Sequence, residues 1–482
     1  MTLFGCHAAN ERIPGDVTIT HVNVVDVIGG RVQRDRTVTI SGNRIIAVDS
    51  GRAGTGRQVA GDGMFLIPGL WDMHVHINDA ADWFFPLFLA NGVTGVRDMG
   101  GSLENLAHWR EMRREGSLMP RVIASGPILT GAVEENDPRV IKVLTVAQAD
   151  AVVDSLAGLG VDFIKVHDWL SAPVYFAILA RARRRHLRVA GHLPVAIDAA
   201  QAADSGQASI EHLGNGWASL LLESNENGPA IKQRLRSLIG KRFAIADLPV
   251  AWTTDQLARY LDGYSEVKSQ ALAVYLARDS VWQTPTLSSL GLWLSIRDSS
   301  RLRDVRMRYL PPEERVMIGE LLNAYGSSRP TTHTQAINSR YYAEQAGLVR
   351  IFSRAGVPLL AGTDVADYPL LFPGFSLHDE LFWLVDAGVS PLAALQAATL
   401  GPARYFHASD SMGSIEPGKL ADLVLLGGNP LDDIRNIDHV VAVIVNGQVI
   451  DQSERLRMLG SVLQRNADSA LLGGNADHID RP

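Results

Sequence analysis

Apolar and polar residues alternate near both ends of the chain, as they do along β-strands with one buried face. The alternating segments are residues 17–25, 36–40, 421–426 and 440–445. Asn446-Gly447, directly after the last of them, is a typical hairpin dipeptide. The pattern predicts small antiparallel sheets. We expect the two ends to build one small β-sandwich domain together, from residues 1–64 and 406–482.

Between the two ends, short apolar runs alternate with segments of helical periodicity, which is typical of βα units and a parallel sheet. The predicted strands are residues 65–77, 93–97, 121–125, 162–166, 188–191, 209–211, 281–284 and 357–361. Eight such strands are the number in a TIM (β/α)8 barrel, whose active site lies at the C-terminal strand ends. The predicted fold class is therefore α/β, with a barrel domain over residues 65–405.

Two predicted connections are longer than a barrel requires. They span residues 214–280, after the sixth strand, and residues 287–356, after the seventh. Long connections after barrel strands overhang the active-site end, so we expect lids or walls of a substrate pocket. Surface helices without a functional role are the alternative. The tail after Ile450 starts with helical character, and we expect its last residues to be loosely held.

Composition narrows the class of partner. The 482 residues are 46% hydrophobic and 20% charged, and 45 Lys and Arg against 52 Asp and Glu give a net charge of −7. This balance provides no basic surface for nucleic acid or an anionic membrane. No apolar stretch approaches the roughly 20 residues of a membrane span. We therefore expect a soluble protein with a small-molecule substrate, and also a homo-oligomer.

The single cysteine, Cys6, excludes an intramolecular disulfide and a thiolate metal cluster, so any metal is held by nitrogen and oxygen. The chain shows no intact signal peptide, which makes the cytoplasm the default location. Leu3-Phe4-Gly5-Cys6 resembles the end of a bacterial lipoprotein signal, so an exported lipoprotein is the alternative if a leader was removed.

Metal-competent residues gather at the predicted strand ends. His74 and His76 are two residues apart, so on a strand both imidazoles point to one face, an arrangement suited to a metal. Further candidates at other strand ends are Lys165, His192, His212 and Asp364. Taken alone, His192 and His212 are each as consistent with a core residue as with a ligand. Lys165 alone is also consistent with a lysine whose ammonium reaches a neighbouring aspartate.

The motifs together resemble those of the metal-dependent amidohydrolase superfamily, of the type with a binuclear metal centre. The similarity is nearest to its imidazolonepropionase-like and prolidase-like dipeptidase branch. The matching motifs are His74-Val75-His76, Phe163-Ile164-Lys165-Val166, Gly191-His192, Glu211-His212-Leu213 and Ala361-Gly362-Thr363-Asp364, with the lead-in Ile67-Pro68-Gly69-Leu70 and the closing segment 413–424.

The resemblance implies a set of roles. Lys165 is expected to carry a carbamate (N6-carboxylysine) that bridges two divalent ions, since an unmodified ammonium cannot ligate a metal. The other ligands implied are His74, His76, His192, His212 and Asp364. Asp364 would also act as general base and then general acid, around a hydroxide shared by the ions. Zn²⁺ is the expected ion, although nitrogen and oxygen ligands also admit Mn²⁺, Co²⁺ or Fe²⁺.

Five further residues receive weaker assignments. His167, two residues after Lys165, is a candidate ligand, substrate contact or packing residue. For Asp98 we expect pairing with Arg97 or orientation of a histidine. Tyr175 is a candidate substrate contact, although a tyrosine in a helix is more often a core residue. We expect a lid contact for His333 and a role at the start of a helix for His378.

The implied activity is hydrolysis of amide bonds in small molecules, such as dipeptides or N-acyl amino acids. Hydrolysis of lactones, esters or organophosphates uses the same centre and stays open. Deamination is disfavoured, because deaminases of the superfamily typically place a glutamate three residues after the histidine of strand five, where this chain has Val195. A scaffold without catalysis is disfavoured because all six ligand positions are filled.

Overall fold

The structure is a computed structural model of the chain. It describes residues 15–50, 54–132, 137, 139–214, 220–241, 253–295, 302–326, 331–367 and 369–474. Cys6, with the lipoprotein alternative that depends on it, lies outside the described residues, as do the last residues of the tail. Among the described residues, no helix is both long and apolar enough to span a membrane.

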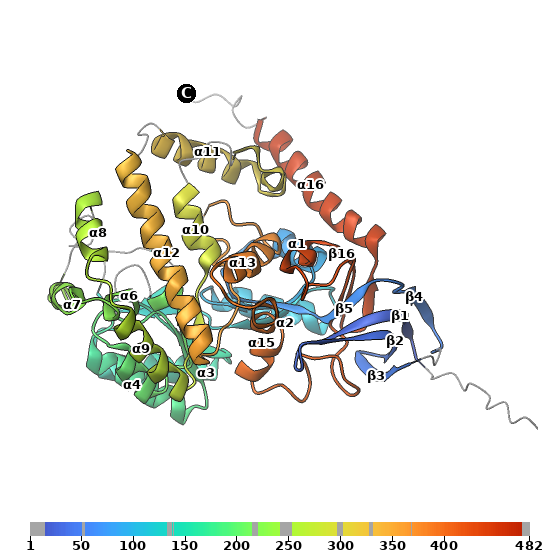
Figure 1. The fold of residues 1–482 in the computed structure, drawn as a ribbon, viewed down its shortest axis with the longest axis horizontal. Coiled ribbons are helices and arrows are strands. Elements are labelled where there is room, and N and C mark those ends of the chain that lie inside the picture. The colour runs from blue at the N-terminus through green and yellow to red at the C-terminus, as the bar shows by residue number, and fades with distance from the viewer. Residues whose placement is uncertain are drawn as a thin grey trace, which may run out of the picture.

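Both ends of the chain contribute to one sheet of eight strands, which lies at one end of the molecule in Figure 1. Its strands are β1 (Val17–Asp26), β2 (Arg31–Ser41), β3 (Arg44–Asp49), β4 (Arg57–Ala60), β5 (Phe65–Pro68), β15 (Leu423–Leu426), β16 (Val440–Val445) and β17 (Gln448–Ile450). The order is β17-β16-β15-β5-β1-β2-β3, and β4 pairs with β1. Apolar residues such as Ile19, Ile40 and Leu425 form the core of this sheet.

Both ends of the chain contribute strands to this sheet, as expected. The expectation that all of these strands are antiparallel was wrong. β1 pairs in parallel with β4 and β5. In place of a predicted pair of separate sheets, one continuous hydrogen-bonded sheet encloses the core. Parallel and antiparallel neighbours leave the same alternation along a strand, so the sequence pattern alone did not distinguish them.

Residues 65–77, predicted as one strand, form two strands in different sheets. β5 pairs with β1 and β15, whereas β6 (Leu70–Val75) pairs with β7. The break falls at Gly69, where an added Cβ would lie 2.1 Å from Thr94 Oγ1. The single-strand prediction was wrong because both halves are buried, so hydrophobicity stays high across the break.

The middle of the chain forms two parallel sheets, in the orders β6-β7-β8 and β10-β9-β11-β12-β13-β14. Their other strands are β7 (Val93–Asp98), β8 (Arg121–Ala124), β9 (Ile128–Thr130), β10 (Val140–Lys142), β11 (Phe163–Val166), β12 (Arg188–Gly191), β13 (Ser209–Glu211) and β14 (Trp282–Thr284). The α/β class is confirmed. β9 and β10 were not predicted, and predicted strand 357–361 is reduced to a bridge between Gln283 and Leu359.

Backbone hydrogen bonds outside the ladders join the edges of these sheets. Leu360 N–H donates to the carbonyl of Gln283 at 2.8 Å, and Met73 N–H to that of Ala361 at 2.8 Å. On the other side, Asp162 N–H, just before β11, donates to the carbonyl of Ala124 at the end of β8 at 3.0 Å. Segment 357–361 therefore connects β14 with β6, even though it is too irregular to form a ladder.

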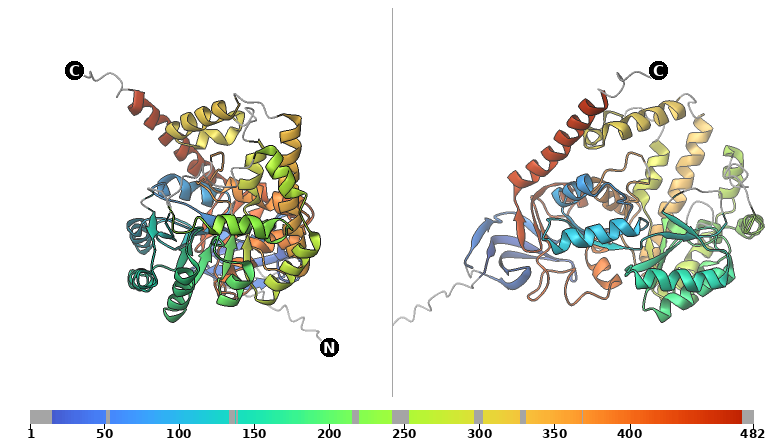
Figure 2. Two further views of the ribbon diagram at one scale, coloured as in Figure 1. Left: turned by 90° about the vertical axis from the view of Figure 1, so that its left-hand side faces the viewer. Right: turned by 180° about the vertical axis from the view of Figure 1, so that it is seen from behind.

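Helices surround the parallel sheets, and Figure 2 shows them from two further sides. They are α1 (Ala81–Ala90), α2 (Leu103–Arg114), α3 (Val146–Gly158), α4 (Ala172–Arg184), α5 (Ala199–Ser205), α6 (Leu220–Glu223), α7 (Gly228–Arg236), α8 (Thr254–Leu261), α9 (Glu266–Arg278), α10 (Leu287–Ser295), α11 (Pro312–Gly326), α12 (Thr332–Ala355), α13 (Phe375–Asp386), α14 (Pro391–Ala397), α15 (Leu400–Tyr405) and α16 (Gln452–Gly474). Three 3₁₀ segments matter below: η1 (His212–Gly214), η4 (Val305–Tyr309) and η5 (Ile434–Asp438).

Both long connections carry helices, as predicted. The first contains α6 to α9 and the second α10 to α12, with α7 and α8 at the end of the molecule opposite β1 to β4 (Figure 1). The tail also begins as a helix, since α16 packs against α1. Local signals start several helices; at α3, Thr145 and Gln148 exchange side-chain and backbone hydrogen bonds in a capping box.

Candidate metal centre

Four histidines from three strand ends lie together. The ring centroids of His74 and His76 are 5.4 Å apart, those of His74 and His212 4.4 Å, and those of His192 and His212 5.0 Å. His74 lies near the end of β6, and His76 comes directly after that strand. His192 comes directly after β12, and His212 directly after β13. The structure thus brings together all four histidines that the sequence selected.

The second nitrogen of each ring is held by another group of the protein. The hydrogen bonds to Nδ1 are those of His74 with Glu211 Oε2 (2.9 Å), His192 with Asp168 Oδ1 (2.7 Å), His212 with Thr286 Oγ1 (2.7 Å) and His76 with the carbonyl of Gly100 (3.3 Å). A carboxylate or a carbonyl only accepts, so Nδ1 of His74, His76 and His192 donates. Such a bond leaves Nε2 free as a ligand atom and fixes the ring orientation.

The electrostatics of the rings also suit metal ligation. Burial lowers the pKa of His74, His192 and His212, so these imidazoles are neutral, as ligation requires. Burial lowers the pKa of His76 too, but the nearby carboxylates of Asp367 and Asp364 outweigh it and the net shift is upward. Within the described residues, His74 Nε2 is buried without a hydrogen-bond partner, as expected of an atom reserved for a metal.

Asp364 lies at the centre of this group. Its Oδ1 is 3.3 Å from His74 Nε2 and 3.4 Å from His76 Nε2, and its Oδ2 is 3.6 Å from His212 Nδ1. Asp364 and His212 have φ values of 68° and 55°, a region that residues other than glycine seldom occupy. Such strain at two candidate ligands is typical of functional sites.

Lys165, on β11, is 1% exposed. Burial lowers its pKa, against the opposing effect of the carboxylates of Glu211 and Asp364. In the described part of the chain, no hydrogen bond or ion pair reaches its Nζ. An isolated buried ammonium is costly. The surroundings therefore fit a lysine that carries a further group.

A buried ion pair behind His74 was missed by the sequence reasoning. Arg97 and Glu211 are both fully buried, and Arg97 Nη2 donates to both oxygens of Glu211 at 2.9 Å. Arg97 Nε also donates to the carbonyl of Met73 at 2.6 Å, and its Nη1 to Ser209 Oγ at 2.9 Å. The guanidinium thus balances the charge of the carboxylate that orients His74.

Asp98 does not pair with Arg97, so that part of the prediction was wrong. Neighbouring residues on a strand point to opposite faces. Asp98 Oδ1 instead accepts the backbone N–H of Ile77 at 2.9 Å, which fixes the chain just after His76. His167 does reach the site: its ring centroid is 4.1 Å from that of His192, and its side chain is 26% exposed.

The remaining candidates lie away from the histidines. Tyr175 is fully buried in α4, and its hydroxyl donates to Gln207 Oε1 at 2.6 Å, so it is a core residue and not a substrate contact. His333 is exposed at the start of α12, 3.4 Å from Asp255 of α8, which is a contact between helices of the two long connections. His378 lies in the first turn of α13, but its ring forms hydrogen bonds with Asp438 Oδ1 at 2.8 Å and the carbonyl of Asn91 at 2.9 Å, so it joins α13 to other segments.

Asp367 and Arg139 were also missed. Asp367 Oδ2 is 3.4 Å from His76 Nε2, and Oδ1 accepts a hydrogen bond from Arg139 Nη1 at 2.8 Å. Arg139, in the turn before β10, is also paired with Asp137. Loop residues three positions beyond Asp364 carry no periodic signal, so only the folded chain shows this second carboxylate beside His76.

A buried carboxyl behind the site should make stability depend on pH. Burial raises the pKa of Glu380 to about 8, while its Oε2 accepts the N–H of Ser288 at 2.7 Å. Between the usual glutamate pKa and pH 8, the unfolded chain loses this proton and the folded chain keeps it. The free energy of unfolding therefore falls as pH rises, by about 1.4 kcal/mol for each pH unit.

We expect Glu380→Gln to flatten this decline in urea denaturation from pH 5 to 8. Exposed Glu320→Gln is the control, and parallel curves for wild type and Glu380→Gln would contradict the expectation.

The comparisons with known proteins give a family match over part of the chain and a shared fold over most of it. Residues 287–450 match the model of the amidohydrolase family. The chain also shares its fold with solved structures of amidohydrolases and of a Xaa-Pro dipeptidase. The family match bears out the resemblance over residues 287–450, and the solved structures show that most of the chain shares their fold.

Three individual proteins show the extent of the similarity. Bottromycin amidohydrolase superimposes with a TM-score of 0.73 and 22% identity, over 93% of this chain and 90% of that chain. A Xaa-Pro dipeptidase with bound methionine superimposes with a TM-score of 0.61 and 18% identity, over 90% of this chain and 99% of that chain. An adenine deaminase of Staphylothermus marinus is 38% identical over 68 residues, 14% of this chain and 10% of the relative. The chain thus spans about a tenth of the length of the curated relatives it matches.

Proposed function

We propose that this protein is a metal-dependent hydrolase of amide bonds in small molecules, such as dipeptides or N-acyl amino acids. One observation carries the proposal: His74 presents a buried Nε2 that forms no hydrogen bond within the described residues and lies within 4.8 Å of the ligand atoms of His76 and Asp364. The family match supports the hydrolase class. The preference for an amide substrate comes from the sequence resemblance.

The residues present fit two divalent ions, for which Zn²⁺ is our expectation. His74, His76 and Asp364 would hold one ion, and His192 and His212 the other. Lys165, as N6-carboxylysine, would supply the oxygen ligands between them. When bound, such ions polarise a carbonyl oxygen and lower the pKa of water toward about 7.

The chain's own groups then have definite tasks. The Asp364 carboxylate accepts a proton from the attacking water and returns it to the leaving nitrogen. Its two oxygens lie near different histidines, so it is placed to do this without a change of backbone position. Glu211 and Asp168 hold His74 and His192 through Nδ1, which keeps the rings from rotating during turnover.

The proposal includes a closed (β/α)8 barrel over residues 65–405 as the scaffold of the site. The hydrogen bonds of segment 357–361 to β14 and β6, and the bond from Asp162 to β8, support this closure. The candidate ligands lie at or just after the C-terminal ends of strands or of segment 357–361, which is where barrel enzymes carry their active sites.

Deamination is the second candidate, because the curated relatives with short matches are adenine deaminases. Val195 argues against it, since its side chain cannot transfer a proton and it is fully buried. Lactone, ester and phosphotriester hydrolysis would use the same ligands. These activities are therefore included in the test.

The test combines metal content with turnover. Protein purified without chelator is analysed by mass spectrometry for metals and assayed on dipeptides, N-acyl amino acids, lactones, phosphotriesters and adenine. We expect about two ions per chain, the stoichiometry of a binuclear site, and turnover of an amide. Lys165→Ala should lose both, and exposed Lys142→Ala neither. In ¹³C-bicarbonate buffer, a carbamate carbon signal should appear in wild type and be absent from Lys165→Ala.

Other results would redirect the proposal. Full metal content and activity in Lys165→Ala would exclude the bridging carbamate. Turnover of adenine in place of amides would favour deamination. A chain without bound ions and without turnover on any substrate would favour a scaffold.

A further inference from the structure

A cavity of about 340 Å³ lies outside the histidine cluster, between α10, η4, α13 and η5. Pockets that bind small molecules begin at about this size, and they combine apolar walls with a few placed polar groups. None of its lining residues is a candidate metal ligand. The cavity is therefore a separate possible binding site.

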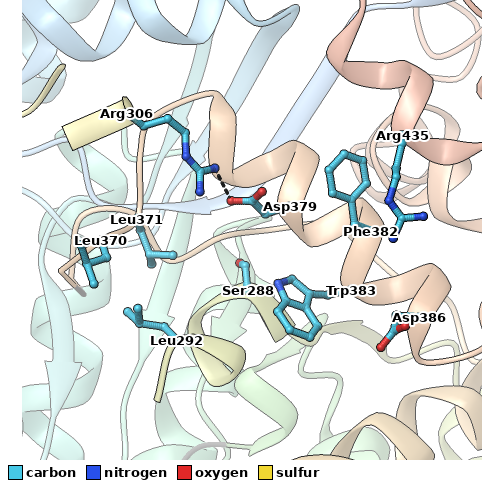
Figure 3. A pocket seen from close by; sticks show the side chains of 10 residues that line it. All are labelled: Ser288, Leu292, Arg306, Leu370, Leu371, Asp379, Phe382, Trp383, Asp386 and Arg435. Atoms are coloured by element: carbon cyan, nitrogen blue, oxygen red, sulfur yellow. Dashed lines mark hydrogen bonds and ion pairs between the residues drawn. The ribbon is translucent and has the colours of Figure 1, made fainter. Parts of the chain in front are cut away.

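The two ends of the cavity differ in chemistry. In Figure 3, Leu292, Leu370 and Leu371 gather at one end, whereas Arg435 and Asp386 lie at the other. The rings of Phe382 and Trp383 lie between the charged end and the centre (Figure 3). The cavity is thus apolar at one end and charged at the other.

Ser288 adds a polar group at the centre of the wall (Figure 3). The residue is 6% exposed, and both its backbone N–H and its hydroxyl face the buried carboxyl of Glu380, whose Oε2 accepts the N–H at 2.7 Å. Ser288 therefore makes the centre of the wall polar.

The charges that remain available are one of each sign. Arg306 and Asp379 neutralise each other across an ion pair of 2.6 Å. Arg435 has only a distant contact with Asp433, 3.9 Å, and its guanidinium is 5.7 Å from the centre of the Phe382 ring. Among the described residues, no hydrogen bond or ion pair engages the carboxylate of Asp386. The charged end therefore offers one cation and one anion at the same end of the cavity.

We infer that this cavity binds a free α-amino acid with an apolar side chain. Arg435 receives the α-carboxylate, Asp386 receives the α-ammonium, and the side chain lies against the rings of Phe382 and Trp383, pointing toward the leucines. A cation and an anion at the same end of a cavity favour a zwitterion over a singly charged ligand, because either lone charge would leave one protein group unpaired. This inference does not depend on the hydrolase proposal.

The first test is isothermal titration calorimetry with L-leucine as the probe. We expect one molecule to bind per chain. 3-Methylbutylamine lacks the carboxylate, 4-methylpentanoate lacks the ammonium and glycine lacks the side chain; each should bind at least about fivefold more weakly, as expected for loss of one solvent-accessible ion pair or of the apolar contact. Absence of detectable L-leucine binding, or equal affinity for the singly charged analogues, would overturn the inference.

Variants then locate the bound amino acid. Asp386→Asn and Arg435→Gln, both at exposed positions, should each weaken L-leucine binding about fivefold, whereas the distant surface variant Arg465→Gln should not. The double variant His74→Ala/His76→Ala removes two candidate metal ligands and should bind L-leucine as wild type does. Loss of binding in that double variant, with unchanged binding in Asp386→Asn and Arg435→Gln, would instead assign the amino acid to the metal centre.

Discussion

Replacing Asp364 by asparagine is expected to lower kcat for amide hydrolysis about 10²- to 10⁴-fold, the usual contribution of a positioned general base. The amide keeps the size of the side chain and an oxygen near His74, but it cannot accept the proton of the attacking water. KM should change little, because the bound substrate is not held by this proton. Steady-state kinetics on the amide found in the substrate panel measures the effect.

Metal analysis of the same preparation separates proton transfer from metal binding. We expect Asp364→Asn to retain at least the ions held by the histidines, and exposed Asp432→Asn to retain full activity. A nearly unchanged kcat with a full complement of ions would show that another group accepts the proton. His167 and Asp367 are then the nearest candidates.

Replacing Arg97 by methionine is expected to lower the free energy of unfolding by about 3 to 5 kcal/mol, the typical cost of leaving one partner of a buried ion pair alone. Both Arg97 and Glu211 are fully buried, so the carboxylate would lose the guanidinium that donates to both of its oxygens at 2.9 Å. Urea denaturation of chelator-treated protein measures the loss without a contribution from bound metal.

A double variant isolates the charge from the packing. In Arg97→Met/Glu211→Gln the buried negative charge is absent, while the glutamine oxygen still accepts the Nδ1–H of His74. We expect this variant to recover most of the lost stability. Equal instability of the single and double variants would mean that the cost comes from the packing of Arg97 against Tyr405, whose ring centre is 5.0 Å from the guanidinium carbon.

The candidate ligands were accessible from sequence because each lies near the end of a short apolar run or just after it, and parallel strands bring their C-terminal ends to one edge. His74 and His76 needed only the two-residue period of a strand. Arg97 and Glu211 carried a signal too, since each places a charge within a buried strand, but their pairing depends on the neighbours of β7 and β13 across the fold. Asp367 gave no signal at all, because it lies in an irregular loop.

The fold was predictable to a similar degree and for similar reasons. Alternation of strands and helices identified the α/β class, and alternation of polar and apolar residues identified the sheet of the two ends. The change of sheet at Gly69 was hidden, because the chain stays buried through it. The irregular backbone of residues 357–361 could not be predicted either, because an apolar run does not indicate which hydrogen bonds its backbone forms.

The sheet shared by both ends constrains the order of events during synthesis. β5 lies beside β15, with Phe65 opposite Leu426 and Pro68 opposite Leu423. The N-terminal strands leave the ribosome long before β15 to β17 exist, so β5 waits with one edge unpaired. β6, which carries His74, begins only two residues after β5. This sheet can therefore be completed only after β15 has been synthesised, and until then the free edge of β5 is open to aggregation or to binding by a chaperone.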